Sequence, residues 1–141
     1  MFGAILLISM DNDKKIEFIL RELIEKNDPS EIATVFSKNY IVHTSNKDFL
    51  GHKIILRWMK DLNQFFSNLK VVKVQFLVQT NEFVVWKRTL RGKIKPSKNK
   101  NLKPGKSIKW DEMIVSKFQD GLIIEEWNNS EFLGTLLSKS H

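Results

Sequence analysis

Apolar residues recur at helical spacing near the start of the chain. Between residues 11 and 24 they occupy positions i, i+3, i+4, i+7 and i+8, which is the stripe that one face of an amphipathic helix carries. The acidic and amide side chains of residues 11–13 precede this stripe and can cap a helix N-terminus. The pattern predicts a first helix whose buried face consists of Ile16, Ile19, Leu20, Leu23 and Ile24.

Two further helices are predicted before residue 69. The segment Asp28-Pro29-Ser30-Glu31 supplies a cap, a proline at the first helical position and an acidic residue, so we expect a short helix that ends before Tyr40. Residues 40–44 are expected to be extended, and residues 46–51 to form a turn. The short helix would bury Ile32, Val35 and Phe36, and the third helix would bury Ile54, Ile55, Trp58, Leu62, Phe65 and Phe66.

From Leu69 onward the apolar period changes from 3.6 to 2. Over residues 72–78 valine and phenylalanine alternate with mostly more polar residues, which predicts a half-buried strand with Val72 and Val78 on its buried face. A long curved strand is expected over residues 83–95.

Two more strands are predicted at residues 107–118 and 122–129. The Asp-Gly pair between them favours a hairpin, and residues 130–137 form a short apolar segment. Helices followed by antiparallel strands indicate an α+β fold, in which three N-terminal helices pack in the concave face of a strongly curved, mostly antiparallel sheet.

The length and composition indicate one domain. We assign it to residues 11–141 and interpret residues 1–10 as an N-terminal arm or an upstream start, because the first nine residues lack a basic region and are too short to span a bilayer. Cysteine is absent and the three histidines lack metal-binding spacing, so neither a metal nor a cofactor is predicted. The chain is expected to be cytoplasmic, without a membrane partner.

Positive charge is concentrated in one segment. Residues 83–110 contain ten basic residues and no acidic one, so the rest of the chain, with 13 basic and 16 acidic residues, carries about −3. The segment lacks interleaved aromatic residues and any nucleic-acid-binding motif, so sequence-specific nucleic acid is not an expected partner. Three interpretations stay open: a solvated hairpin, a device that steers an anionic ligand, or a contact with an acidic partner.

Four stretches in order resemble the SnoaL-like polyketide cyclases of the nuclear-transport-factor-2-like superfamily. They are YIVHT with the following LGHKIILRWMKDLNQFF, then TLRG, then KPGK before a strand, and last FQDGLIIEEWNNSEFLGTLL. The resemblance implies a cone that encloses an apolar pocket for a small apolar molecule, and a homodimer formed through the outer sheet face. The superfamily includes cyclases, isomerases, dehydratases and domains without catalysis, so the fold alone does not define the activity.

Two positions depart from the cyclase pattern. The resemblance aligns the family's catalytic aspartate with Asn128 and its accompanying histidine with Ile114. An amide cannot act as a general base near neutral pH, although Asn128 could donate a hydrogen bond to an enolate or carbonyl oxygen. We therefore do not expect the family's standard chemistry, but we do expect its apolar pocket.

Other residues are candidates for the chemistry. Period-2 spacing places Ile124, Glu126 and Asn128 on one face, and Glu112 on the corresponding face of the preceding strand. A carboxyl in an apolar cavity has a raised pKa, so either glutamate could replace the aspartate, unless it lies at the rim or pairs with lysine. The catalytic candidates are Glu112, Glu126, Asn128 and His43, which matches a family histidine at the pocket edge; the ligand-binding candidates are Trp58, Trp110, Ile114 and Arg88.

The sequence is compatible with three classes of function. The first is an enzyme that moves protons on an apolar carbonyl compound by cyclisation, isomerisation or dehydration. The second is a module that binds a lipophilic ligand without chemistry. The third is a protein-interaction domain whose basic loop contacts an acidic partner, which an interior filled with aromatic side chains would favour.

Overall fold

The structure is a computed structural model that describes residues 11–45, 47–96 and 103–129. Its helices are α2 (Asn12–Ile24), α3 (Ile32–Val35) and α4 (His52–Phe65), and its strands are β1 (Phe36–His43), β2 (Asp48–Leu50), β3 (Phe66–Gln79), β4 (Phe83–Ile94), β5 (Ser107–Gln119) and β6 (Leu122–Asn129). The expected N-terminal arm, the apolar segment at residues 130–137 and the middle of the basic loop lie outside the described residues.

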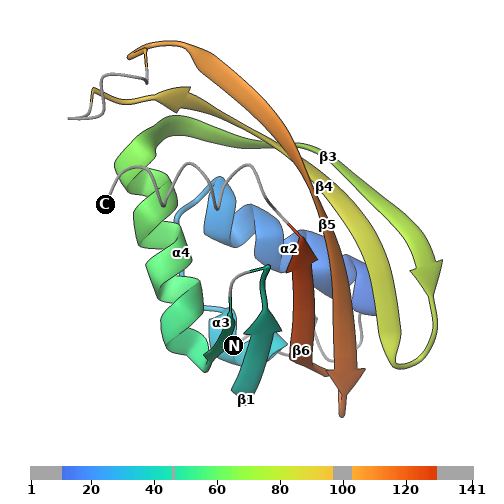
Figure 1. Ribbon diagram of the computed structural model, residues 1–141. Coiled ribbons are helices and arrows are strands. Elements are labelled where there is room, and N and C mark those ends of the chain that lie inside the picture. The colour runs from blue at the N-terminus through green and yellow to red at the C-terminus, as the bar shows by residue number, and fades with distance from the viewer. Residues whose placement is uncertain (1–10, 46, 97–102, 130–141) are drawn as a thin grey trace.

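The six strands form one sheet in the order β2-β1-β6-β5-β4-β3. Only β1 and β6 are parallel to each other; all other neighbouring strands are antiparallel. The long strands β3 to β5 curve around α2, and α4 packs beside the β1 end of the sheet (Figure 1). The predicted α+β fold with helices in the concave face of a curved sheet is confirmed.

The segment around the short helix differs from the prediction. The helix spans only Ile32–Val35. Before it, Asp28 accepts a hydrogen bond from the Ser30 backbone N–H. After it, Phe36 already has extended backbone angles and begins β1, four residues earlier than expected. The expected turn at residues 46–51 contains the short strand β2, and Phe66 belongs to β3 rather than to the third helix.

Strand β3 does not keep a strict period of two. Its pairing with β4 shifts register between Val71 and Lys73 and again between Phe76 and Val78. Each extra residue rotates the following side chains to the other face. As a result Val72 and Val78 are 45% and 55% exposed, so their predicted burial was wrong.

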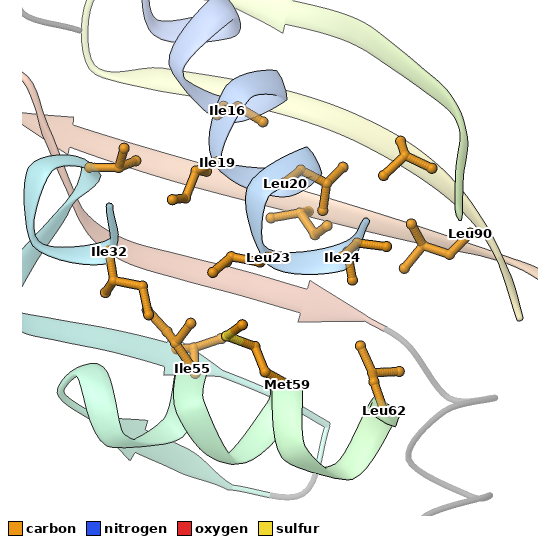
Figure 2. Packing of buried hydrophobic residues seen from close by; sticks show 14 of the residues in the cluster. Ile16, Ile19, Leu20, Leu23, Ile24, Ile32, Ile55, Met59, Leu62 and Leu90 are labelled. Atoms are coloured by element: carbon orange, nitrogen blue, oxygen red, sulfur yellow. The ribbon is translucent and has the colours of Figure 1, made fainter. Parts of the chain in front are cut away.

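The core fills the space between α2, α4 and the concave sheet face. Figure 2 shows the apolar side chains of α2 pointing toward those of α4, with Leu90 of the sheet beside them. All five residues of the predicted stripe on α2 are buried. Burial of each such side chain contributes about 1.5–3 kcal/mol, so this stripe holds α2 in the concave face.

Gly92 permits a close approach between β4 and the start of β3. A Cβ atom at this position would lie 2.8 Å from both Cβ and Cγ of Phe66. The Phe66 ring in turn stacks on Trp110, with centroids 5.0 Å apart. The lack of a side chain at residue 92 therefore allows an aromatic pair to pack at the base of the concave face.

Candidate functional site

Strand register gathers polar side chains on the concave face. Ser116 of β5 is paired with Glu126 of β6, and Ile114 is paired with Asn128. On the other side of β5, Glu112 is paired with Arg88 of β4. The inward face of β5 predicted from the sequence is observed, since Trp110, Glu112, Ile114 and Ser116 are all buried.

At the start of β6, the residue that faces the core is not the predicted one. The register between β5 and β6 shifts between Lys117 and Phe118. Ile123 is consequently the buried residue, at 1% exposure, whereas Ile124 is only half-buried. Glu126 and Asn128 come after this irregularity and lie opposite Ser116 and Ile114, as expected.

Glu126 is held by two hydroxyl groups. The Tyr40 hydroxyl of β1 donates to Glu126 Oε1 at 2.6 Å, and the Ser116 hydroxyl donates to Oε2. Trp86 Nε1 donates to the Ser116 oxygen at 2.9 Å. The four side chains thus form a continuous chain of hydrogen bonds in which the Glu126 carboxylate lies between Tyr40 and Ser116.

Burial changes the acidity of this group. Removal from water raises the pKa of Glu126, against the opposing effects of the Ser116 and Tyr40 hydrogen bonds and the Arg88 charge. Burial, followed by the neighbouring Glu126 charge, raises the pKa of Tyr40 well above its ordinary value. Glu126 therefore holds its proton more tightly than an exposed glutamate, which is the direction that suits proton transfer near neutral pH.

Glu112 has a different environment. Its Oε1 lies 2.6 Å from Arg88 Nε and 2.5 Å from Arg88 Nη2, and its Oε2 accepts a hydrogen bond from Trp110 Nε1 at 3.0 Å. The Glu112 side chain is fully buried and that of Arg88 is 10% exposed. The two groups form a buried ion pair, and the two Glu112 oxygens are thus in contact with Arg88 and Trp110.

Aromatic rings flank the Arg88 guanidinium. Its central carbon lies 4.9 Å from the centre of the Trp58 ring and 5.4 Å from that of Trp86. Such contacts stabilise a cation that is removed from water. The structure therefore brings Arg88 together with Trp58, and places Trp110 and Ile114 on the same sheet face.

Asn128 carries the one buried amide oxygen in this cluster that lacks a partner. Among the described residues, no hydrogen-bond donor reaches its Oδ1. A buried polar atom without a partner costs about 1–3 kcal/mol. Such an atom is rare in native interiors and is a potential ligand contact.

His43 is not part of this cluster. It is paired with Trp127 of β6, one residue beyond the pairing of Val42 with Glu126, and therefore lies on the opposite sheet face. Its ring nitrogens face Asp48 and Glu125. The structure thus separates His43 from the other three catalytic candidates.

Tyr40, Ser116 and Trp86 were missed as site residues. Ser116 was already on the predicted inward face, so its position was available from the spacing. The contact of Tyr40 with Glu126 joins residues 86 positions apart and depends on the parallel pairing of β1 with β6, which local periodicity does not reveal.

The described residues include no group of three or more His, Asp or Glu side chains that could hold a metal ion. Within the same part of the chain, no helix is long and apolar enough to cross a membrane.

Solved structures of similar fold define the class of this molecule. IdmH from Streptomyces antibioticus, a candidate polyketide cyclase, superposes with a TM-score of 0.72 at 20% identity over 92% of this chain and 98% of its own. AclR from Streptomyces galilaeus, a candidate hydroxylase, gives 0.67 at 15% identity, covering 91% and 96%. An NTF2-like protein from Anabaena variabilis ATCC 29413 gives 0.65 at 10% identity, covering 82% and 83%. The fold is therefore the NTF2-like cone.

The sequence defines the family within this class. Residues 15–137 match the family model of the SnoaL-like polyketide cyclases, and the chain belongs to that family. No curated protein sequence matches the chain.

Proposed function

We propose that the concave face binds a small apolar carbonyl compound and that Glu126 transfers a proton on it. The observation that carries this proposal is the contrast between two inward carboxylates. Glu112 is neutralised by Arg88, whereas Glu126 is held by the hydroxyl groups of Tyr40 and Ser116. Within the described residues, Glu126 has no ion-pair partner, and its pKa is raised by burial.

The proposed step is abstraction of a proton next to the carbonyl group. The C–H bond breaks, its proton goes to a Glu126 carboxylate oxygen, and the electron pair moves to the carbonyl oxygen as an enolate. An amide N–H of Asn128 would donate to that oxygen. Return of the proton to another carbon completes an isomerisation. In a cyclisation the enolate carbon attacks a second carbonyl carbon of the same molecule, the π electrons of that carbonyl move to its oxygen, and the resulting alkoxide takes the proton from Glu126.

Ligand binding can be tested first. A panel of ketones, quinones and polyketide analogues is screened for thermal stabilisation at fixed salt. A ligand at 100 times its dissociation constant adds about 2.7 kcal/mol to the free energy of unfolding. A hit that persists at high salt supports an apolar site.

Catalysis is then tested with a bound ketone by NMR, as exchange of its α-hydrogens in D₂O. Glu126→Gln is expected to bind the ketone but to exchange about 10²–10⁴-fold more slowly than the wild type, since this is the usual contribution of a general base. Asp111→Asn, on the exposed face of β5, serves as the matched control. Exchange by Glu126→Gln at the wild-type rate would overturn the assignment.

A second function, binding of a protein partner without catalysis, is favoured by one observation. The aromatic and charged side chains of the concave face are themselves buried: Trp86 is 3% exposed, Trp110 5% and Arg88 8%. An interior that is filled by its own side chains favours a function in which the protein surface binds a partner. Absence of stabilisation by every member of the ligand panel would favour this alternative.

We also propose that the molecule forms a homodimer through the convex sheet face. Cross-strand pairing aligns four apolar residues in one row, which we call the convex row: Val78, Val85, Val115 and Trp127. Val78 and Trp127 are 55% and 38% exposed, and the nearby Met113 is 47% exposed. Contiguous exposed apolar surface of this kind is typical of association sites, and a second copy would cover it through the same row.

A further inference from the structure

His43 contacts two carboxylates on the convex side of the sheet. Its Nδ1 lies 2.7 Å from Asp48 Oδ1, and its Nε2 lies 2.5 Å from Glu125 Oε2. Carboxylates accept hydrogen bonds, and a neutral imidazole has only one N–H to donate. With both carboxyl groups ionised, both contacts can be hydrogen bonds at the same time only when the His43 ring carries two protons.

The backbone pairing at this place is short. Strands β1 and β6 pair at Phe36 with Ile123, and then not again until Ile41 pairs with Glu125. The ladder that follows covers only three residue pairs, of which the middle one contains Glu126. Because so few residues of β1 and β6 pair through their backbones, side-chain contacts between the two strands are important for holding them together.

Glu125 and Glu126 are consecutive residues that point to opposite faces. Glu126 faces Tyr40 and Ser116 on the concave side, while Glu125 faces His43 on the convex side. The Trp127 ring stacks on the His43 ring with centroids 5.2 Å apart. The position of the Glu126 backbone is thus linked to the contacts that His43 makes.

Among the described residues, the charged groups that act on the His43 ring are Glu125 and Asp48. On β5 the register partner of Glu125 is Lys117, whose Nζ lies over the Phe83 ring at 5.7 Å. In the segment before β2, Lys47 Nζ lies over the Phe49 ring at 5.0 Å. Of the titratable groups on the elements packed around His43, Asp48 of β2 and Glu125 of β6 are those that contact its ring.

We propose that Asp48, His43 and Glu125 form a proton-dependent clasp that fixes β6 against β1 and β2 and so positions Glu126. The part that concerns Glu126 rests on the proposed function. His43 is then a positioning residue: it contacts no ligand and acts through the strand that carries the proton-transferring carboxylate.

The direction of the pH effect follows from the contacts. Hydrogen bonds to Glu125 and then to Asp48 raise the pKa of His43 above its ordinary value. A histidine with a raised folded-state pKa contributes stability that is complete below its unfolded pKa, near 6.5, and is lost as the pH rises through the folded-state pKa. The clasp is therefore closed at acidic pH and loses one contact at alkaline pH.

The clasp can be tested without any ligand. The ¹⁵N NMR shifts of the His43 ring, followed as the pH is raised, are expected to show that both nitrogens stay protonated to a higher pH than in an ordinary histidine. Hydrogen-exchange protection factors of the Glu126 and Trp127 amides are expected to fall at least tenfold as His43 loses its proton. In His43→Gln they should be low and independent of pH, and in Lys117→Gln they should behave as in the wild type.

Two results would overturn the proposal: a His43 ring that loses its second proton at no higher pH than an ordinary histidine, or protection of the Glu126 amide that His43→Gln leaves unchanged. If His43→Gln does not fold, Glu125→Gln provides the same comparison. Where a ketone exchanges its α-hydrogens, kcat should fall with the His43 titration in the wild type but not in His43→Gln, at unchanged KM. If protection of the Glu126 amide depends on pH as expected but the protein exchanges no α-hydrogens, the proposed role of Glu126 is refuted and the clasp is still supported.

Discussion

The buried pair of Arg88 and Glu112 gives a quantitative prediction for the variant Arg88→Met. Methionine keeps most of the aliphatic volume but removes the cation. Glu112 is fully buried and lies within 2.6 Å of two guanidinium nitrogens, so the substitution removes the Arg88 cation from a buried carboxylate that also accepts a hydrogen bond from Trp110.

The size of the expected cost follows from variants of other buried ion pairs. Loss of one partner of such a pair usually costs about 3–5 kcal/mol. We therefore expect Arg88→Met to lower the free energy of unfolding by about 3–5 kcal/mol at pH 7.

Urea unfolding at pH 7 measures the effect. The double variant Arg88→Met/Glu112→Leu should recover most of the loss, since replacement of a buried ion pair by apolar residues is often neutral or stabilising. Lys87→Met is the matched control: the contact of Lys87 with Asp111 is 3.7 Å long, and the two side chains are 38% and 54% exposed. Its loss should cost less than about 1 kcal/mol.

The reasoning would be refuted if Arg88→Met lost no more stability than the Lys87→Met control. Such a result would mean that the buried pair of Arg88 and Glu112 contributes no more than an exposed ion pair. Equal loss in the single and double variants would show that packing of the Arg88 side chain between the tryptophan rings, rather than charge, determines the cost.

Two other predictions follow from packing and exposure. Gly92→Ala should destabilise the domain by about 1–3 kcal/mol through overpacking against Phe66, measured as a lower urea midpoint; an unchanged midpoint would show that the aromatic pair can shift freely. Val115→Asp, in the convex row, should convert a dimer into a monomer in sedimentation equilibrium while the far-UV circular dichroism spectrum is retained, and a wild-type protein that is already monomeric would contradict the proposed interface.

Much of the fold was predictable because apolar spacing responds directly to burial. The stripe of α2 and the inward face of β5 from Trp110 to Ser116 follow the expected periods. Errors occurred where one extra residue enters a strand: bulges in β3 expose Val72 and Val78, and the register shift in β6 buries Ile123 in place of Ile124.

The site was only partly accessible from sequence. The spacing placed Glu112 and Glu126 on inward faces but did not distinguish them, since the difference lies in their partners on other strands. Arg88 reaches Glu112 from β4, and Tyr40 reaches Glu126 from β1. Contacts of this kind depend on strand order and register, which local patterns leave undefined.

The place of β6 in the sheet affects how the protein is made. This strand is the last of the described strands along the chain but lies between β1 and β5 in the sheet. Its Glu126 accepts a hydrogen bond from Tyr40, which lies 86 residues earlier. At roughly 5–20 residues per second of synthesis, the edge of β1 that receives β6 waits several seconds for its partner. Unpaired edges promote association with other chains, so we expect the nascent chain to be most prone to aggregation before β6 is synthesised.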